Sequence, residues 1–346
     1  MRNRTRLAGL VAVALVAASG ILAGTSLAQT GKAGRAQATS VCLVTDVGGL
    51  NDKGFNHLAY VGMQQAQKKL TGVTGRVIES HAGSDYIPNL LSCVQGGADL
   101  TIAVGFLMED ALNTVSTHFP KSNFAIIDGA YTDLAGKPAN VRGILFREQE
   151  AGYLVGWLAT KQLLAEKKKP ILGAVGGIEV PAVDHYIAGF QAGAKAASPS
   201  AKVLYGFSQS FTDQAKCKEV ALNQVAQGSK VEFGVAGQCG LGALDAAKEN
   251  NGWGIGVDAD QLFLGPYMLT SAVKRVDVGV YRTIKYVVDG NFHGTGNTTF
   301  SVRAGGVTIG ATSPKVSKAI LTGEKILEKK IATGKIKGIP TKPTAS

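Results

Sequence analysis

Short apolar runs alternate with stretches of helical periodicity along most of this chain, and this alternation restricts the fold more than any other feature. The runs are Val41–Thr45, Arg76–Ser80, Leu100–Gly105, Asn123–Asp128 and Val141–Phe146, then Ile171–Gly176, Lys202–Ser208, Val231–Gly237, Trp253–Asp258 and Gly306–Gly310. From Phe55 to Leu70, apolar residues recur at steps of three and four, which predicts an amphipathic helix. Apolar strands alternating with helices predict an α/β fold with parallel sheets covered on both faces.

The chain also contains an internal similarity. Residues 94–105 and 225–237 each read as a helix end, a glycine stop, a strand and a glycine-rich exit. A helix predicted over Glu148–Glu166 would carry the chain from one half to the other, and the lysines and proline at 167–170 suit its end. We therefore predict two similar lobes. Residues 41–147 and 258–300 are assigned to lobe 1, residues 148–257 and 301–338 to lobe 2, and residues 339–346 to a tail.

The N-terminal segment has the composition of a targeting signal. Three arginines within residues 2–6 precede an apolar run, Leu7–Val16, and small residues then lead to a small-x-small cleavage pattern. We predict a signal peptide over residues 1–28, a disordered lead-in over residues 29–40, and export to the periplasm or cell exterior in association with the envelope. The uncharged stretch up to Thr30 is also long enough for an uncleaved membrane anchor, which stays an alternative.

The charge of the chain raises the question of nucleic acid. The formal net charge is +11, and three of these charges lie in the predicted signal peptide. The remaining lysines are scattered, with a mild excess only from Lys315 to Lys342. A stripe of basic residues interleaved with aromatic ones, which nucleic-acid binding normally needs, does not occur. A nucleic-acid partner is therefore not expected.

The chain has four cysteines: Cys42, Cys93, Cys217 and Cys239. An even number of cysteines in an exported chain favours disulfides, and no C-x-x-C spacing indicates zinc or a redox pair. Four cysteines allow three pairings. None lies near the predicted cleavage site, so lipid attachment there is not supported.

Ligands of open parallel sheets bind beyond the carboxyl ends of the strands. The residues at those ends are Asp46, Gly105, Phe106, Asp128, Phe207, Ser208, Gly237, Gln238 and Asp258. Carboxylates accept hydrogen bonds from hydroxyl groups, and aromatic rings stack on flat, uncharged ring systems. The sequence therefore predicts a cleft between the lobes that suits a polyol or a ribose.

The stretch Thr45–Asn56 is the most informative of these loops. Its glycines permit a tight loop close to a ligand. Asn51 or Asp52 could cap the helix that follows, and for Asp52 capping alone is an equally good interpretation. For Phe55, the alternative to a ligand contact is a core contact in the first turn of the helix.

Motifs for catalysis or cofactor binding do not occur. The glycines of residues 173–177 lack the spacing of a dinucleotide fingerprint, and neither a Walker-type ending nor a Gly-x-Ser-x-Gly elbow is present. The five histidines, at positions 57, 81, 118, 185 and 293, show no helical i, i+4 pairing. We therefore expect neither a cofactor nor a metal, and a binding protein in place of an enzyme.

Several stretches in unbroken order carry a resemblance to a known family. They are Val44–Asn56, Ala125–Asp128, Glu150–Gly156, Gly189–Gly193, Val235–Leu244, Gly254–Gln261 and Thr270–Arg275. From about Val41 to Lys330 the chain resembles the basic membrane protein family, the PnrA-like substrate-binding proteins of ABC transporters. The resemblance implies two Rossmann-like lobes joined by a hinge, as in type I periplasmic binding proteins.

The resemblance also implies a purine nucleoside as ligand, with its base between aromatic rings. By motif, Phe55 and Phe207 would stack on the base, with Phe211 as a second candidate for the latter ring. The residues that would read its polar edge are Asn51, Asp52 or Asn56; those around the sugar are Asp128, Asp258 and Lys274; and Asp46 would shape the loop.

The expected mechanism is hinge closure of a monomer around the ligand, which a membrane permease then reads. A sensory receptor of the same fold for a sugar or other solute is the alternative, and a nucleoside-cleaving enzyme is a more distant one.

The chain departs from the family at its signal end. Family members are commonly lipoproteins, whereas the first cysteine here, Cys42, lies inside the first predicted strand. Pairing Cys42 with Cys93 and Cys217 with Cys239 would keep each bridge within one lobe.

Overall fold

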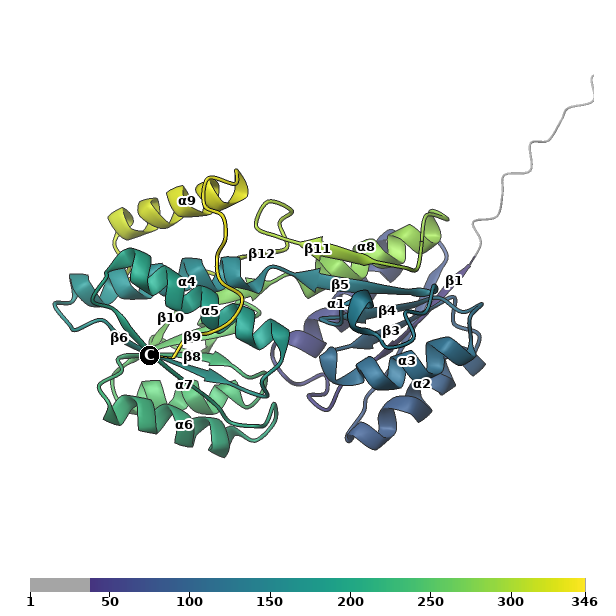
Figure 1. Cartoon of the computed structure of the whole chain (residues 1–346), viewed down its shortest axis with the longest axis horizontal. Helices are drawn as coiled ribbons and strands as arrows, with labels where there is room; N and C mark the ends of the chain where they lie inside the picture. Colours follow the sequence, from purple (N-terminus) through teal and green to yellow (C-terminus); the bar gives the residue numbers. More distant parts are fainter. Residues whose placement is uncertain (1–37, 346) are drawn as a thin grey trace, which may run out of the picture. The chain divides into compact units, whose positions relative to one another are not determined.

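Two sheets organise the part of the chain that the computed structural model describes, residues 38–345 (Figure 1). The predicted signal peptide and most of the predicted lead-in lie outside these residues. The strand orders are β11-β5-β4-β3-β1-β2 and β12-β10-β9-β8-β6-β7. The first sheet consists of β1 (Thr39–Val44), β2 (Val73–Ile78), β3 (Leu100–Val104), β4 (Phe124–Ile127), β5 (Val141–Phe146) and β11 (Asn297–Phe300). The second consists of β6 (Ile171–Gly176), β7 (Lys202–Phe207), β8 (Val231–Val235), β9 (Trp253–Asp258), β10 (Met268–Lys274) and β12 (Val307–Ile309).

The strands pair in parallel, apart from the antiparallel edge pair β10–β12. The central strands β3, β4, β8 and β9 are buried along their whole length, as continuous apolar runs require. The predicted α/β fold with two parallel-sheet lobes is confirmed. Strands β10 and β11 were not predicted, because β10 carries Thr270 and Ser271 in its interior and β11 is a polar edge strand.

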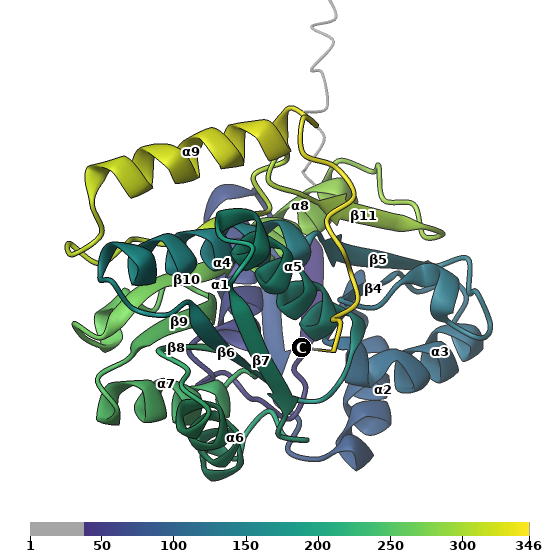
Figure 2. The same ribbon diagram turned by 60° about the vertical axis from the view of Figure 1, so that its left-hand side comes forward.

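Helices cover both faces of each sheet (Figure 2). We call the first sheet with its helices lobe 1, and the second with its helices lobe 2. The helices of lobe 1 are α1 (Phe55–Lys69), α2 (Tyr86–Gln95), α3 (Glu109–His118) and α8 (Val276–Val288). Those of lobe 2 are α4 (Glu148–Ala165), α5 (Pro181–Ala197), α6 (Gln214–Ala226), α7 (Gly240–Glu249) and α9 (Lys318–Ala332). Helix α1 packs against α8, α2 against α3, α4 against α5, and α6 against α7.

The described chain passes between the lobes at three places, which we call the first, second and third crossover. They lie between β5 and α4, between β10 and α8, and between β11 and β12. The expected boundary at residue 258 differs from this sheet membership. Because β10 pairs with β9, lobe 2 extends to Lys274 before the chain returns to lobe 1.

Helices α4 and α5 are in backbone contact. Gly152 and Gly156 on α4 face Gly189 and Gly193 on α5, and a Cβ atom on any of them would collide with backbone atoms of the other helix. Small residues at i and i+4 let two helices approach this closely. This contact fixes the start of α5 beside the start of α4.

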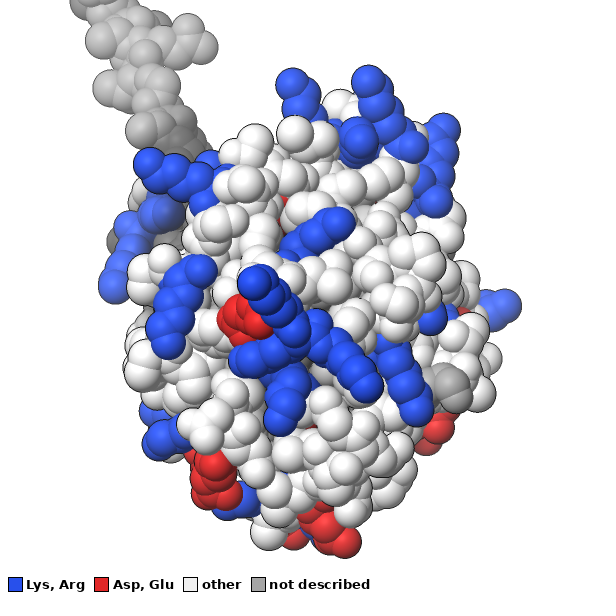
Figure 3. Space-filling model, turned by 90° about the vertical axis from the view of Figure 1, so that its left-hand side faces the viewer, with Lys and Arg blue, Asp and Glu red and all other residues white. Residues whose placement is uncertain are grey.

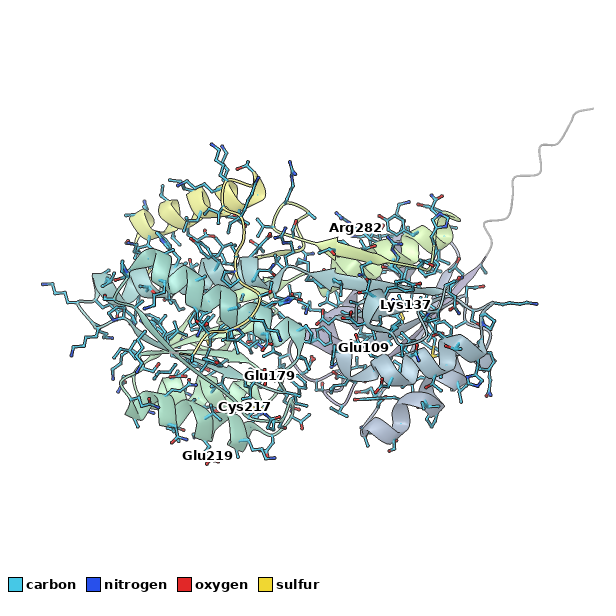
Figure 4. The ribbon with its side chains drawn as sticks, viewed as in Figure 1. Glu109, Lys137, Glu179, Cys217, Glu219 and Arg282 are labelled. Carbon is cyan, nitrogen blue, oxygen red and sulfur yellow. A yellow bond between two sulfur atoms is a disulfide. The ribbon has the colours of Figure 1, made fainter. Side chains whose placement is uncertain are left out.

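Each lobe contains one disulfide. Cys42 on β1 pairs with Cys93 on α2, and Cys217 on α6 pairs with Cys239, just before α7 (Figure 4). This is the pairing that keeps each bridge within one lobe.

The end face of lobe 2 is rich in lysine and arginine and poor in acidic residues (Figure 3). Lys167, Lys168 and Lys169, after α4, are exposed. Several acidic residues of the same lobe are instead buried, among them Asp184, Glu232 and Glu324. Burial of acidic side chains therefore contributes to the basic surface.

The C-terminal segment, residues 339–345, lies on α5 (Figure 1). The backbone of Thr344 makes two hydrogen bonds to the side chain of Gln191, and Lys342 Nζ lies 2.7 Å from Oδ2 of the buried Asp184. The end of the chain is thus attached to lobe 2.

Candidate ligand-binding site

A cavity lies between the lobes at the carboxyl ends of their strands. The space between its walls is about 680 Å³, which includes solvent at its open mouth. Lobe 1 contributes the loop after β1 and the ends of β3 and β4, and lobe 2 contributes the start of α5 and the ends of β8 and β9. The predicted residues that line it are Asp46, Asp52, Phe55, Asn56, Phe106, Asp128, Gly237, Asp258 and Lys274.

Two predicted residues, Asn51 and Phe207, are not among those that line the cavity. Asn51 is exposed. Phe207, at the end of β7, packs over Gly176 of the neighbouring strand and edge-on against Tyr205, with the ring centroids 6.1 Å apart. Phe211, four residues further on, lines the cavity in its place.

A buried carboxylate, Asp46, holds the loop after β1. Its Oδ1 accepts hydrogen bonds from Gly48 N at 2.9 Å and from Asn56 Nδ2 at 2.8 Å. Burial raises the pKa of Asp46 to about 6, against the lowering effect of these hydrogen bonds. The polar atoms of Asp46 and Asn56 are therefore largely engaged within the loop.

Asp52 caps helix α1. Its Oδ2 accepts from Asn56 N at 2.6 Å, and its Oδ1 accepts from Gly54 N at 2.9 Å and from His57 N at 3.2 Å. These donors include backbone groups that the first turn of a helix leaves unpaired. Capping thus accounts for both carboxylate oxygens of Asp52. Phe55, the first residue of α1, lines the cavity.

Lys274, the last residue of β10, is buried with only 2% of its surface exposed. Its Nζ lies 2.5 Å from Asp128 Oδ2, 3.1 Å from Glu148 Oε1 and 5.0 Å from the ring centroid of Phe55. Burial lowers the pKa of Lys274, but the carboxylates of Asp128, Glu148 and Asp258 raise it more. The ammonium therefore keeps its charge inside the protein.

Asp128 and Asp258 occupy equivalent places in the two lobes, after β4 and at the end of β9. Both have φ of 63°, a left-handed conformation that is uncommon outside glycine and, less often, asparagine, aspartate and histidine. Tyr186 Oη donates to Asp258 Oδ1 at 3.1 Å. Burial raises the pKa of Asp258 to about 6, against the effects of Lys274 and Tyr186, and burial likewise raises the pKa of Asp128.

One carboxylate oxygen of Asp128 is not engaged by the residues that the structure describes. Its Oδ1 is buried and has no hydrogen-bond partner within residues 38–345. An unpaired buried acceptor is costly, so a hydrogen-bond donor is expected there. A ligand hydroxyl in the cavity would supply one.

Two buried residues that contact the predicted ones were not identified from the sequence: Tyr186, which contacts Asp258, and Glu148, which contacts Lys274. Tyr186 is flanked on α5 by Val183 and Ile187, which read as a core face, although a buried tyrosine hydroxyl normally needs a partner. Glu148 reads as an acidic residue in the first turn of a helix, where it suits the helix dipole. Burial raises the pKa of Glu148, but Lys274 and His185 lower it more, so the net shift is downward.

The site therefore combines carboxylates, one ammonium and the rings of Phe55, Phe106 and Phe211. Such groups recognise hydroxyls and a flat ring. The residues that the structure describes include no group of three or more histidine, cysteine, aspartate or glutamate side chains arranged to hold a metal ion.

Comparisons with known proteins identify the class of protein to which this chain belongs. A solved solute-binding protein of an ABC transporter from Aeropyrum pernix K1 matches with a TM-score of 0.77 and 28% identity, covering 87% of this chain and 94% of that one. The family model of the PnrA-like ABC transporter substrate-binding proteins matches residues 39–340. The chain belongs to this family, as the resemblance predicted.

Three relatives illustrate the family. The nucleoside-binding protein BmpA of an ABC transporter from Lactococcus lactis is 32% identical, covering 90% of this chain and 92% of the relative. Basic membrane protein D of Borreliella burgdorferi is 32% identical over 77% of each chain. A protein of Pyrococcus abyssi, 35% identical over 86% of this chain and 74% of its own length, is called a lipoprotein.

The lipoprotein name contrasts with the expected lack of lipid attachment. The segment that this expectation concerns lies outside the described residues. Within residues 38–345, no helix has the length and apolarity needed to cross a membrane.

Proposed function

We propose that this protein binds a purine nucleoside in the interlobe cavity, outside the cytoplasm, and delivers it to the permease of an ABC importer. The observation that carries the proposal is the buried cluster of Asp128, Asp258 and Lys274 beside the ring of Phe55. Carboxylates at the ends of two strands suit the adjacent hydroxyls of a ribose, and the ring suits a base.

The two lobes supply complementary parts of the proposed site. Phe55 from lobe 1 and Phe211 from lobe 2 are the rings proposed to contact the base, and Phe211 replaces the Phe207 expected from the sequence. The BmpA relative, whose name states nucleoside binding, supports this ligand class. The excess of carboxylates over ammonium groups favours an uncharged nucleoside over a phosphorylated one.

The crossovers suit closure around a ligand. Lobes joined by a few crossing segments can rotate about them and bury the ligand on both faces. In the structure the lobes meet beside the cavity, where Gln261 Nε2 of lobe 2 donates to Lys53 O of lobe 1 at 3.4 Å. The closed form would present the surface that the permease reads.

Thermal-shift screening tests the ligand class. Guanosine, inosine and adenosine are compared with pyrimidine nucleosides, free bases, sugars and amino acids. A purine nucleoside at about 100 times its Kd should stabilise the fold by about 2.7 kcal/mol and raise the Tm by several degrees. The proposal fails if the purine nucleosides leave the Tm unchanged while another class raises it. Chromatography of the same mixtures checks for free base, whose release would indicate an enzyme.

A further inference from the structure

Glu148 does not line the interlobe cavity, but it lines an adjoining one that shares Phe106, Asp128 and Ala182 with it. It is the first residue of α4, directly after the first crossover, and its side chain is 2% exposed. Its Oε1 is 3.1 Å from Lys274 Nζ, and its Oε2 is 3.2 Å from Nδ1 of His185, on α5. Its contact with the cavity therefore passes through Lys274.

Lys274 is held from two sides. Asp128 of lobe 1 takes one of the three ammonium donors, and Glu148 takes a second. Without Glu148, the ammonium would be free to turn toward Asp128 and Asp258 alone. The oxygens that these two carboxylates offer to a ligand would then be engaged by the lysine.

The pair also joins two crossovers. Lys274 is the last residue before the second crossover, and Glu148 is the first residue after the first. Both residues belong to lobe 2, so their ion pair fixes the ammonium relative to that lobe where the chain passes to lobe 1, and Asp128 contacts it from lobe 1. Movement at the hinge is therefore transmitted directly to a group that faces the ligand.

We infer that Glu148 is a positioning residue of the binding site: it holds the Lys274 ammonium in place for the ligand and couples that ammonium to the hinge. The inference rests on the proposed function. It assigns a role in ligand affinity to a carboxylate that does not itself line the cavity formed by Asp128, Asp258 and Lys274.

A matched control lies two residues away. Glu150, on the same turn of α4, is also buried, and its oxygens contact Arg147 at 3.0 Å and Val302 N at 2.7 Å. Glu150 and Val302 line neither the interlobe cavity nor the adjoining one, and Arg147 lines only the adjoining one. Glu150→Gln therefore removes a buried carboxylate from the same helix without affecting Lys274.

The test is isothermal titration of wild type, Glu148→Gln and Glu150→Gln with the nucleoside that gives the largest thermal shift. We expect Glu148→Gln to weaken the Kd by about tenfold or more, and Glu150→Gln to stay within about twofold of wild type. A folded Glu148→Gln variant within that twofold range overturns the inference. Failure of wild type to bind any nucleoside overturns the proposed function itself.

Two further variants exclude a purely structural effect. If Glu148→Gln does not fold, Glu148→Asp keeps the charge but withdraws the carboxylate, and it should weaken binding where Glu150→Asp does not. In a Lys274→Met background, adding Glu148→Gln should change the remaining affinity by less than about twofold, because Glu148 then has no ammonium group to position. An equal loss in both backgrounds contradicts the inference.

Discussion

At the scale of single residues, Asp258 is unfavourable both in its backbone conformation and in the burial of its carboxylate. Its backbone is left-handed, its carboxylate is buried, and its Oδ1 is held by Tyr186. A left-handed backbone at a residue other than glycine costs of the order of 1 kcal/mol or more. Such strain persists where the surrounding structure overdetermines it, and it is concentrated at functional sites.

We expect Asp258→Asn to separate binding from stability. Asparagine tolerates the left-handed backbone, and loss of the charge removes the cost of burying a carboxylate whose pKa is raised. The variant should therefore keep or raise the Tm while weakening nucleoside binding by about tenfold or more. Calorimetry and thermal melts measure the two effects. Asp245→Asn, at an exposed position on α7, is the control and should change neither; unfolding of Asp258→Asn would show that the residue is structural.

At the scale of elements, side-chain acceptors from β8 and α6 lie over the same glycine of β6. The side-chain oxygens of Glu232 on β8 and Gln224 on α6 point to the space above Gly173. Gln224 Oε1 and both oxygens of Glu232 have no hydrogen-bond partner among the described residues. Gln224 uses its amide to donate to Ala174 O. A protonated Glu232 could donate to Gln224 Oε1 and resolve the conflict.

The stability of lobe 2 should consequently depend on pH. Burial raises the pKa of Glu232 to about 8, against a smaller lowering effect of the nearby Ser229, and no charged group contributes to this shift. Because the folded state holds this proton more tightly than the unfolded state, the contribution is complete below about pH 4.5 and is lost as pH rises through about 8. Denaturant titration at pH 5 and 8.5 should show wild type losing on the order of 4 kcal/mol relative to Glu232→Gln. A pH-independent difference between the two proteins would contradict this expectation.

The elements that could be predicted from sequence are those whose own pattern is sufficient. Buried parallel strands such as β3 and β9 appear as apolar runs, and the strand-end rule then placed Asp128 and Asp258 in one cavity. Tyr186 and Glu148 could not be found in this way, because they reach the site from the starts of two helices. Their positions depend on how α4 and α5 pack, which is a tertiary property. Phe207, which we expected to line the cavity, packs over Gly176 of the neighbouring strand, because a ring at a strand end can pack on the next strand as readily as on a ligand.

At the scale of the whole molecule, the covalent structure leaves the hinge free. Each disulfide closes a loop within one lobe, with sequence separations of 51 and 22 residues, and neither spans the cavity. Relative motion of the lobes is therefore limited only by the three crossovers and by the contacts across the cleft.

Ligand binding should make the protein more compact in solution. Small-angle scattering should give a smaller radius of gyration with a saturating purine nucleoside than without it, because closure brings the lobes together around the ligand. Wild type with a solute that leaves the Tm unchanged serves as the unliganded reference. An unchanged radius of gyration in wild type, with binding shown by calorimetry, would rule out hinge closure as the response.

The attachment of the C-terminal segment to α5 has a practical consequence. The described chain begins with β1 in lobe 1 and ends at residues 339–345 on lobe 2, where Gln191 and Asp184 hold it. The two ends of the described chain therefore belong to different lobes. Donor and acceptor fluorophores fused at those ends would convert lobe rotation into a change in energy transfer, so that the protein itself could serve as an optical sensor of its ligand.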